Sequence, residues 1–252
     1  MLKRLFVLIL LLMNFLLGEG QSIKDSSIFL STFSISYAYQ IPGGDLAKRF
    51  GNSSSVGADL TFKTKRNYIV GLEFNYIFGK KLKSEASGVL DSIATSNYQI
   101  INKYGEFAQI ALSERGYYAG IKIGKLFPVK KSNPNSGILI TGSVGLLEHK
   151  IRIDNDANNA PQILDDYKKG YDRLTNGLSV TEFIGYQHLS SKKRFNIYAG
   201  FEFYQAWTKC RRDFNFDTME KDNLNRHDYL YTFKVGWIFL IRKRQPAEYY
   251  YN

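Results

Sequence analysis

The sequence predicts an all-β protein that folds as a closed antiparallel transmembrane β-barrel of about eight strands. Three observations predict it: an apolar leader, apolar–polar alternation with a period of two, and connections that alternate between short and long.

Residues 1–20 have the composition of a signal peptide. Lys3 and Arg4 precede an almost unbroken apolar run from Leu5 to Leu17, and the small residues at 18–20 suit cleavage before Gln21. The run is shorter than the roughly 20 residues of a transmembrane helix, which disfavours an uncleaved membrane anchor. We therefore expect an exported chain.

The overall composition restricts the partners. The net charge of +11 would suit nucleic acid, but export and the lack of any nucleic-acid motif argue against it. The only cysteine is Cys210, so no intrachain disulfide can form and the fold depends on hydrogen bonding and packing.

Alternation with a period of two marks the strands. In 67–79, Tyr68, Leu72 and Phe74 share one face, whereas Gly71 and Glu73 share the other. Similar segments are predicted at 29–39, 116–124, 195–204 and 229–241, with weaker ones at 55–62, 137–147 and 177–186.

The apolar faces are long and aromatic, in a chain with 18 tyrosines and 18 phenylalanines, and the opposite faces hold glycines, small polar residues and isolated charges. This pattern favours a lipid-facing exterior and a polar interior over the alternative, a soluble lipocalin-like barrel. An eight-stranded barrel is just wide enough to be filled by side chains. We therefore predict an interior ion network, with interior glycines making room for it; its members are Glu73, Lys122, Glu182, Glu202 and Lys234.

Glu182 is an exception to the pattern, because the alternation places this acid on the apolar face with Leu178 and Ile184. A carboxylate that faces lipid is unfavourable. We expect a β-bulge near Glu182 that turns its side chain inward.

The connections predict the orientation. Those at 63–67, 128–136 and 190–194 are short, and those at 41–54, 80–115, 151–173 and 209–228 are long. Short periplasmic turns and long outer loops are typical of outer-membrane barrels, so both termini should lie in the periplasm.

The short connections and the end of the last strand carry a predicted cationic rim, made of Lys63, Lys65, Arg66, Lys130, Lys131, Lys192, Lys193, Arg194, Arg242, Lys243 and Arg244. Such a rim suits anionic head groups or an acidic periplasmic partner.

The chain resembles the outer-membrane β-barrel proteins of the Bacteroidota, of the small eight-stranded type. The resemblance lies in the segments 40–51 (QIPGGDLAKRFG) and 167–175 (YKKGYDRLT) and in the tail that ends at Tyr251. The last strand also resembles the C-terminal signal that barrel-assembly machinery reads, through Lys234, Gly236, Phe239 and Ile241. The chain continues past that signal, so we expect a barrel over 21–245 and a short periplasmic tail over 246–252.

No motif predicts catalysis, a metal site or a cofactor. His149 and His227 lie near the expected outer end and His188 near a periplasmic turn, with Asp154 and Asp228 as possible orienting groups. The acidic pairs at 154–156 and 165–166 match no calcium loop. We expect a protein that is not an enzyme.

Two functional hypotheses follow from these features. The first is an outer-membrane barrel with a structural or interaction role, as a small subunit of an assembly or secretion complex. The alternative is a lipid-modifying enzyme or a narrow conduit for small solutes. Expected partners are outer-membrane lipids, the barrel-assembly machinery during insertion and other envelope proteins, but not nucleic acid.

Overall fold

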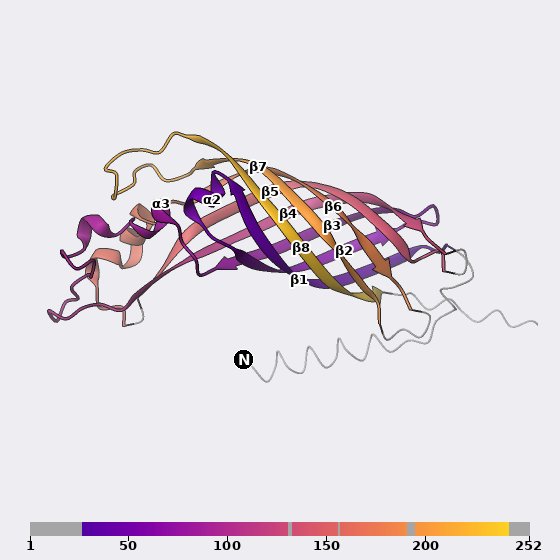
Figure 1. Ribbon diagram of the computed structural model, residues 1–252, viewed down its shortest axis with the longest axis horizontal. Helices are drawn as coiled ribbons and strands as arrows, with labels where there is room; N and C mark the ends of the chain where they lie inside the picture. Colours follow the sequence, from indigo (N-terminus) through magenta and orange to yellow (C-terminus); the bar gives the residue numbers. More distant parts are fainter. Residues whose placement is uncertain (1–26, 131–132, 156, 191–194, 242–252) are drawn as a thin grey trace, which may run out of the picture.

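The chain forms a closed barrel of eight antiparallel strands, each paired with its neighbours in the sequence, and β8 closes the ring on β1 (Figure 1). The computed structural model describes residues 27–130, 133–155, 157–190 and 195–241. The strands are β1 (Leu30–Gly44), β2 (Ser53–Lys63), β3 (Tyr68–Gly79), β4 (Ile110–Pro128), β5 (Gly137–Asn155), β6 (Thr175–His188), β7 (Ile197–Cys210) and β8 (Asn225–Ile241). The predicted fold class and all eight predicted strand segments are confirmed.

The hairpin of β4 and β5 is longer than the alternation predicts. It continues to the pair of Ile110 with Asn155, whereas the pairing of β5 with β6 stops at His149 and Thr175. The two strands therefore project beyond the rest of the wall and support the loops around them. Among the described residues, no helix is long and apolar enough to cross a membrane.

The two faces of the wall differ as the alternation predicts. Aliphatic and aromatic side chains such as Ile35, Leu72 and Phe201 are exposed on the outside. Serine, threonine, asparagine and charged side chains such as Ser36, Asn75 and Thr181 are buried inside. The polarity is thus the reverse of that of a water-soluble barrel, which keeps its apolar side chains inside.

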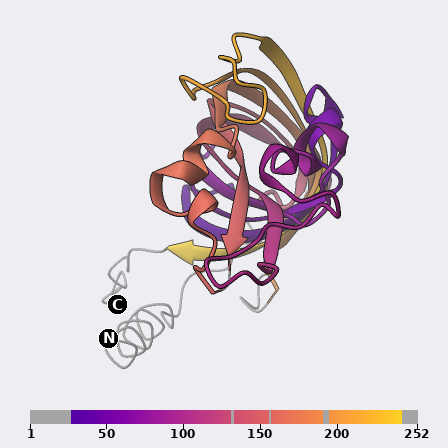
Figure 2. The ribbon, with the colours of Figure 1, turned by 90° about the vertical axis from the view of Figure 1, so that its left-hand side faces the viewer.

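The long connections, after β1, β3, β5 and β7, lie at one end of the barrel, which we call the long-loop end (Figures 1 and 2). They contain the short helices α2 (Leu46–Arg49) and α3 (Ser84–Ser87) and the 3-10 helices η1 (Asp91–Ile93), η2 (Pro161–Ile163) and η3 (Asp165–Gly170). Loop residues such as Leu46, Val89 and Ile163 share a hydrophobic core with Leu147 and Ile151 of β5. The loops are therefore folded onto the barrel as a cap that shares its core with the barrel wall.

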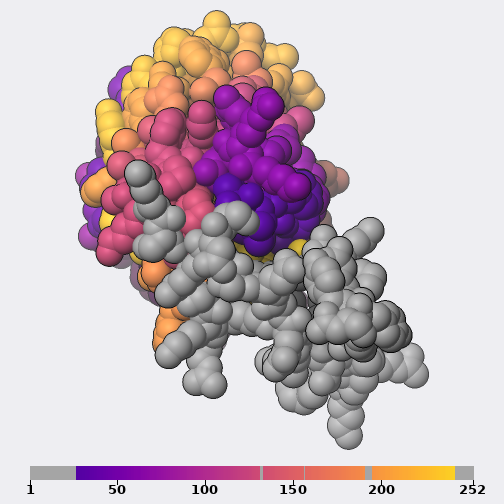
Figure 3. Space-filling model, turned by 90° about the vertical axis from the view of Figure 1, so that its right-hand side faces the viewer, coloured from indigo at the N-terminus to yellow at the C-terminus, as the bar shows by residue number. Residues whose placement is uncertain are grey.

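The other end, the short-turn end, faces the viewer in Figure 3, and the described residues before β1, 27–29, lie at this end. Ile28 N donates to Asn135 Oδ1 at 3.4 Å, although Asn135 lies in the connection between β4 and β5, across the barrel from β1. Lys63 Nζ donates to Ile28 O at 3.0 Å and to Asn67 Oδ1 at 2.8 Å. This segment lies next to a second apolar cluster that includes Leu30, Leu126 and Ile238.

Candidate functional site

The centre of the barrel holds a buried ion network. Lys122 Nζ of β4 lies 2.7 Å from Asp59 Oδ1 of β2 and pairs with Glu73 of β3. Lys234 Nζ of β8 lies 3.1 Å from Glu202 Oε2 of β7 and 3.9 Å from Glu73 Oε2. Glu73 therefore joins the two lysines, and three carboxylates surround two ammonium groups.

Asp59 is the member that the sequence analysis missed. Its Oδ2 accepts hydrogen bonds from Tyr198 Oη at 2.9 Å and from Ser34 Oγ at 3.1 Å. Asp59 is the single acid on the inward face of β2, in line with Ser53, Ser55 and Gly57. Its place on that polar face is the signal that identifies it.

Aromatic side chains close the network toward the long-loop end. The rings of Tyr118 and Tyr204 meet edge to face at 5.3 Å, and both residues are fully buried. Tyr204 Oη donates to Glu202 Oε2 at 2.9 Å, and Ser143 Oγ donates to Glu73 Oε1 at 2.8 Å. Because hydroxyl groups satisfy the carboxylates, this layer is held by directional bonds as well as by packing.

Toward the short-turn end the network borders a cavity of about 40 Å³. Polar groups of Asp59, Lys122 and Gln187 line it together with the apolar Leu139 and Ile238. A cavity of this size with polar walls has room for about one or two water molecules.

Glu182 does not belong to the network, which corrects the sequence-based expectation. The pairing of β6 with β5 and β7 is continuous through Glu182, with Gly142 and Phe203 as its partners, so no bulge turns the residue inward. Its side chain is exposed on the outer face. The strand assignment was right and the predicted bulge was wrong, because one carboxylate is too small a penalty to shift a whole strand's register. The other four predicted members, Glu73, Lys122, Glu202 and Lys234, line the interior.

A second polar layer lies at the long-loop end, under α2. His149 Nε2 lies 3.0 Å from Asp228 Oδ2, and Thr208 Oγ1 donates to the same oxygen at 2.5 Å. Arg49 of α2 donates to Thr175 Oγ1 at 2.9 Å, and burial lowers the pKa of its guanidinium to about 10. The sequence analysis considered both His149 and Asp228, but the fold encloses the pair completely.

Among the residues that the structure describes, no nucleophile lies in hydrogen-bond contact with His149. His149 Nδ1 is buried without a hydrogen-bond partner and the ring meets Phe50 edge to face at 5.6 Å. The hydroxyl of Thr208 bonds to the aspartate rather than to the histidine. The arrangement therefore lacks the nucleophile–base contact that acyl transfer needs.

The predicted cationic rim is only partly described. Lys65, Arg66 and Lys130 are exposed at the short-turn end. Lys63 is buried and donates to Ile28 O and Thr64 O, so it holds backbone carbonyls and is not part of an exposed rim. Several predicted features lie outside the described residues: the signal peptide, the tail 246–252, Lys131, Lys192, Lys193, Arg194, Arg242, Lys243 and Arg244.

The residues of the predicted assembly signal occupy two sides of β8. Lys234 and Gly236 face inward, where Lys234 joins the network and Gly236 lies under the ring of Tyr198. Phe239 lies on the outer side, where its ring packs near Trp237 and Phe33, and Ile241 is exposed. Each of the four residues of the predicted signal therefore also has a position in the folded barrel, two on its inner face and two on its outer face. The role of these residues in assembly stays a prediction.

Fold and site together define a closed β-barrel with a polar interior that holds a buried ion network, and with an apolar outer wall. No protein-family model matches the chain, and no curated protein matches it. Among solved structures, it is similar to Ail, the attachment invasion locus protein of Yersinia pestis, with a TM-score of 0.46 and 10% identity over 84% of this chain and 99% of that chain. It is also similar to the outer membrane protein OprG of Pseudomonas aeruginosa, with a TM-score of 0.32 and 9% identity over 86% of this chain and 97% of that chain.

Proposed function

We propose that the protein is an outer-membrane β-barrel that acts through its surfaces, as a structural or interaction subunit of a larger envelope assembly. The observation that carries the proposal is the cap at the long-loop end. Its loops bury a shared core of residues such as Phe50, Leu90 and Tyr171, so they present a preformed surface to the outside. A preformed surface loses little conformational entropy when a partner binds.

The cap also exposes large apolar side chains. Tyr98 is 79% exposed and Met219 is 69% exposed, in loops that precede β4 and β8. Both have positive φ angles, 58° and 55°, which bulky residues rarely adopt. Exposed apolar residues held in an unfavourable backbone conformation are typical of binding loops.

The apolar outer wall supports a membrane location. Outward tyrosine and tryptophan side chains lie near both ends of the strands, such as Tyr68 and Tyr186 at one end and Tyr39 and Trp207 at the other. Such aromatic belts are typical of membrane interfaces. The short turns would then face the periplasm with both termini, in agreement with the resemblance to outer-membrane barrels of the Bacteroidota.

The occupied centre of the interior favours a role other than transport or catalysis. The buried ion network and the Tyr118–Tyr204 layer lie inside the barrel with a cavity of about 40 Å³ beside the ion pairs, and apolar clusters lie toward the two ends. His149 and Asp228 are enclosed and lack a nucleophile. We therefore propose neither a conduit nor an enzyme.

The test is affinity purification of the tagged full-length protein from envelopes in mild detergent, followed by quantitative mass spectrometry. We expect a protein at stoichiometric level that is lost when Tyr98 and Met219 are both changed to serine, while the barrel stays folded. A protein recovered alone from the membrane would overturn the subunit role. Recovery in the soluble fraction would overturn the membrane location.

A further inference from the structure

The outer wall carries one acid in the middle of its apolar band. Along β6, Glu182 lies between the outward side chains of Leu178 and Ile184. Its cross-strand partners on the same face are Gly142 and Phe203. Apolar residues therefore surround Glu182 along the strand and across it, far from both ends of the barrel.

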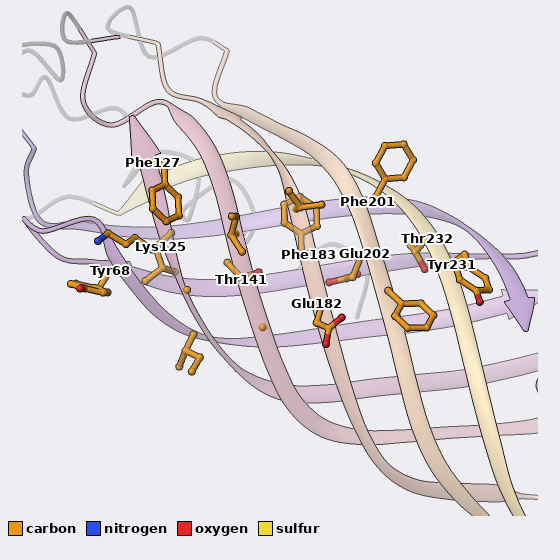
Figure 4. Close-up of a pocket in the computed structure, with 17 residues that line it drawn as sticks. Tyr68, Lys125, Phe127, Thr141, Glu182, Phe183, Phe201, Glu202, Tyr231 and Thr232 are labelled. Atoms are coloured by element: carbon orange, nitrogen blue, oxygen red, sulfur yellow. The ribbon is translucent and has the colours of Figure 1, made fainter. Parts of the chain in front are cut away.

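Glu182 lies in a surface groove of about 960 Å³ that runs across β3 to β8 (Figure 4). Isoleucine and phenylalanine side chains such as Ile140, Ile184 and Phe201 form most of its walls. Gly142 contributes to the hollow, because a Cβ there would meet nothing closer than Thr181 O at 3.6 Å. Figure 4 shows Glu182 on β6, with Thr141 and Phe201 labelled on the two neighbouring strands, β5 and β7.

The carboxylate has little compensation within its own chain. Among the described residues, its hydrogen-bond partner is Gln205, whose Nε2 lies 3.5 Å from Glu182 Oε1, at the limit of a hydrogen bond. A carboxylate in hydrocarbon is unfavourable unless a cation or strong donors meet it. The groove therefore combines mostly apolar walls with a carboxylate that makes no ion pair, since Lys125, which also lines the groove, lies over the rings of Tyr68 and Phe127.

A second copy of the chain does not offer the missing cation at this depth. Among the described strands, outward lysines and arginines lie toward the ends of the wall: Lys125, which lines the part of the groove nearest the short-turn end, and Arg115, Lys150, Arg152 and Lys209 at the long-loop end. Lys125 also lies over the ring of Tyr68, 4.7 Å from its centroid. Charge complementarity thus points to a different protein.

We propose that this groove docks a membrane-embedded segment of another envelope protein, and that a lysine or arginine on that segment pairs with Glu182. The inference rests on the membrane location proposed above. It adds a contact inside the bilayer to the contacts expected at the cap. The ion pair would take both the Glu182 carboxylate and the partner's cation out of contact with lipid. A segment without a cation would leave the carboxylate unpaired, so the groove would select for a segment that carries one.

The experiment uses a photocrosslinking amino acid at Ile184, inside the groove, and a matched control at Ile35, an exposed outward isoleucine on β1. After irradiation of intact envelopes, mass spectrometry locates the crosslinked peptide. We expect an adduct at Ile184 but not at Ile35, in an apolar partner segment that contains lysine or arginine. Glu182→Gln keeps the shape of the side chain but removes its charge, and should lower the adduct yield at least about tenfold. Gly142→Val should fill the groove and also lower the yield.

Several outcomes would overturn the docking proposal while leaving the membrane location intact. They are adducts to lipid alone, adducts to a second copy, a partner segment without a cation, and a yield that Glu182→Gln leaves unchanged. Failure of the protein to reach the membrane would instead overturn the proposed function itself. Ala119→Val, an outward position outside the groove, controls for the added bulk.

Discussion

Glu202 and Lys234 face each other inside the barrel from neighbouring strands, with Lys234 Nζ 3.2 and 3.1 Å from the two carboxylate oxygens. Both side chains are almost completely buried. Removing one partner of such a pair leaves an uncompensated buried charge, whereas removing both can be nearly neutral. The pair therefore gives the interior network a direct thermodynamic signature.

We expect Glu202→Leu to lower the free energy of unfolding by about 3–5 kcal/mol. The double variant Glu202→Leu/Lys234→Met should recover most of that loss, because neither charge remains. Guanidinium unfolding of the barrel in lipid vesicles measures both values. Equal stability of the single and double variants would show that the two residues are not coupled.

Gly236 and Tyr198 give a second prediction. A Cβ on Gly236 would lie 2.3 Å from Tyr198 Cε1, and the Tyr198 ring is held by Asp59 and by the edge of Phe183. Gly236→Ala should therefore lower the free energy of unfolding by about 1–3 kcal/mol. Gly142→Ala is the matched control, since its Cβ would make only an ordinary contact with Thr181 O, at 3.6 Å. The same unfolding assay compares them, and an equal effect of the two changes would contradict the steric explanation.

The barrel could be predicted from the sequence because period-two alternation is a local property that each strand shows by itself. Tyr68 and Phe74 on one face and Glu73 on the other already define the inside and the outside. The cap could not be predicted this way. Its core joins Leu46, Val89 and Ile163 from three different loops, and contacts between distant segments leave no periodic signal in any one of them.

The interior network was predictable to the same extent as the strand faces. Glu73 and Lys234 lie on strands with clear alternation, whereas Asp59 lies on β2, where serines and glycine weaken the pattern. Glu182 shows the opposite error. A rule that every outward residue is apolar predicts a bulge at Glu182, but the register of β6 is continuous and the side chain stays outward. The residue that breaks this rule lies in the candidate docking groove.

The loops of the cap should be separable from the barrel by one substitution. Phe216, in the loop before β8, meets Tyr171 edge to face at 5.4 Å, and its amide donates to Gly170 O at 2.9 Å. Phe216→Ala should remove about 2 kcal/mol of local stability and speed proteolysis of this loop, without changing the unfolding of the barrel. Phe214→Ala, at a more exposed ring nearby, is the control. A parallel loss of barrel stability would mean that the cap and the wall unfold together.

Asp45 should make the anchoring of α2 dependent on pH. Its carboxylate accepts from Lys48 Nζ at 2.7 Å and from His227 N at 2.9 Å. These two hydrogen bonds, chiefly that from Lys48, lower the pKa of Asp45 below its ordinary value. Because the pKa of the folded state is the lower one, the stabilisation is present above about pH 4 and is lost as the pH falls through the folded pKa. Hydrogen exchange of the Phe50 and Gly51 amides, corrected for the intrinsic rate, should accelerate below about pH 4 in the wild type.

Asp45→Asn should show the faster exchange at neutral pH and no further change on acidification. A variant that keeps the acid-induced acceleration would assign it to another carboxylate, such as Asp222, which is hydrogen-bonded to Arg226.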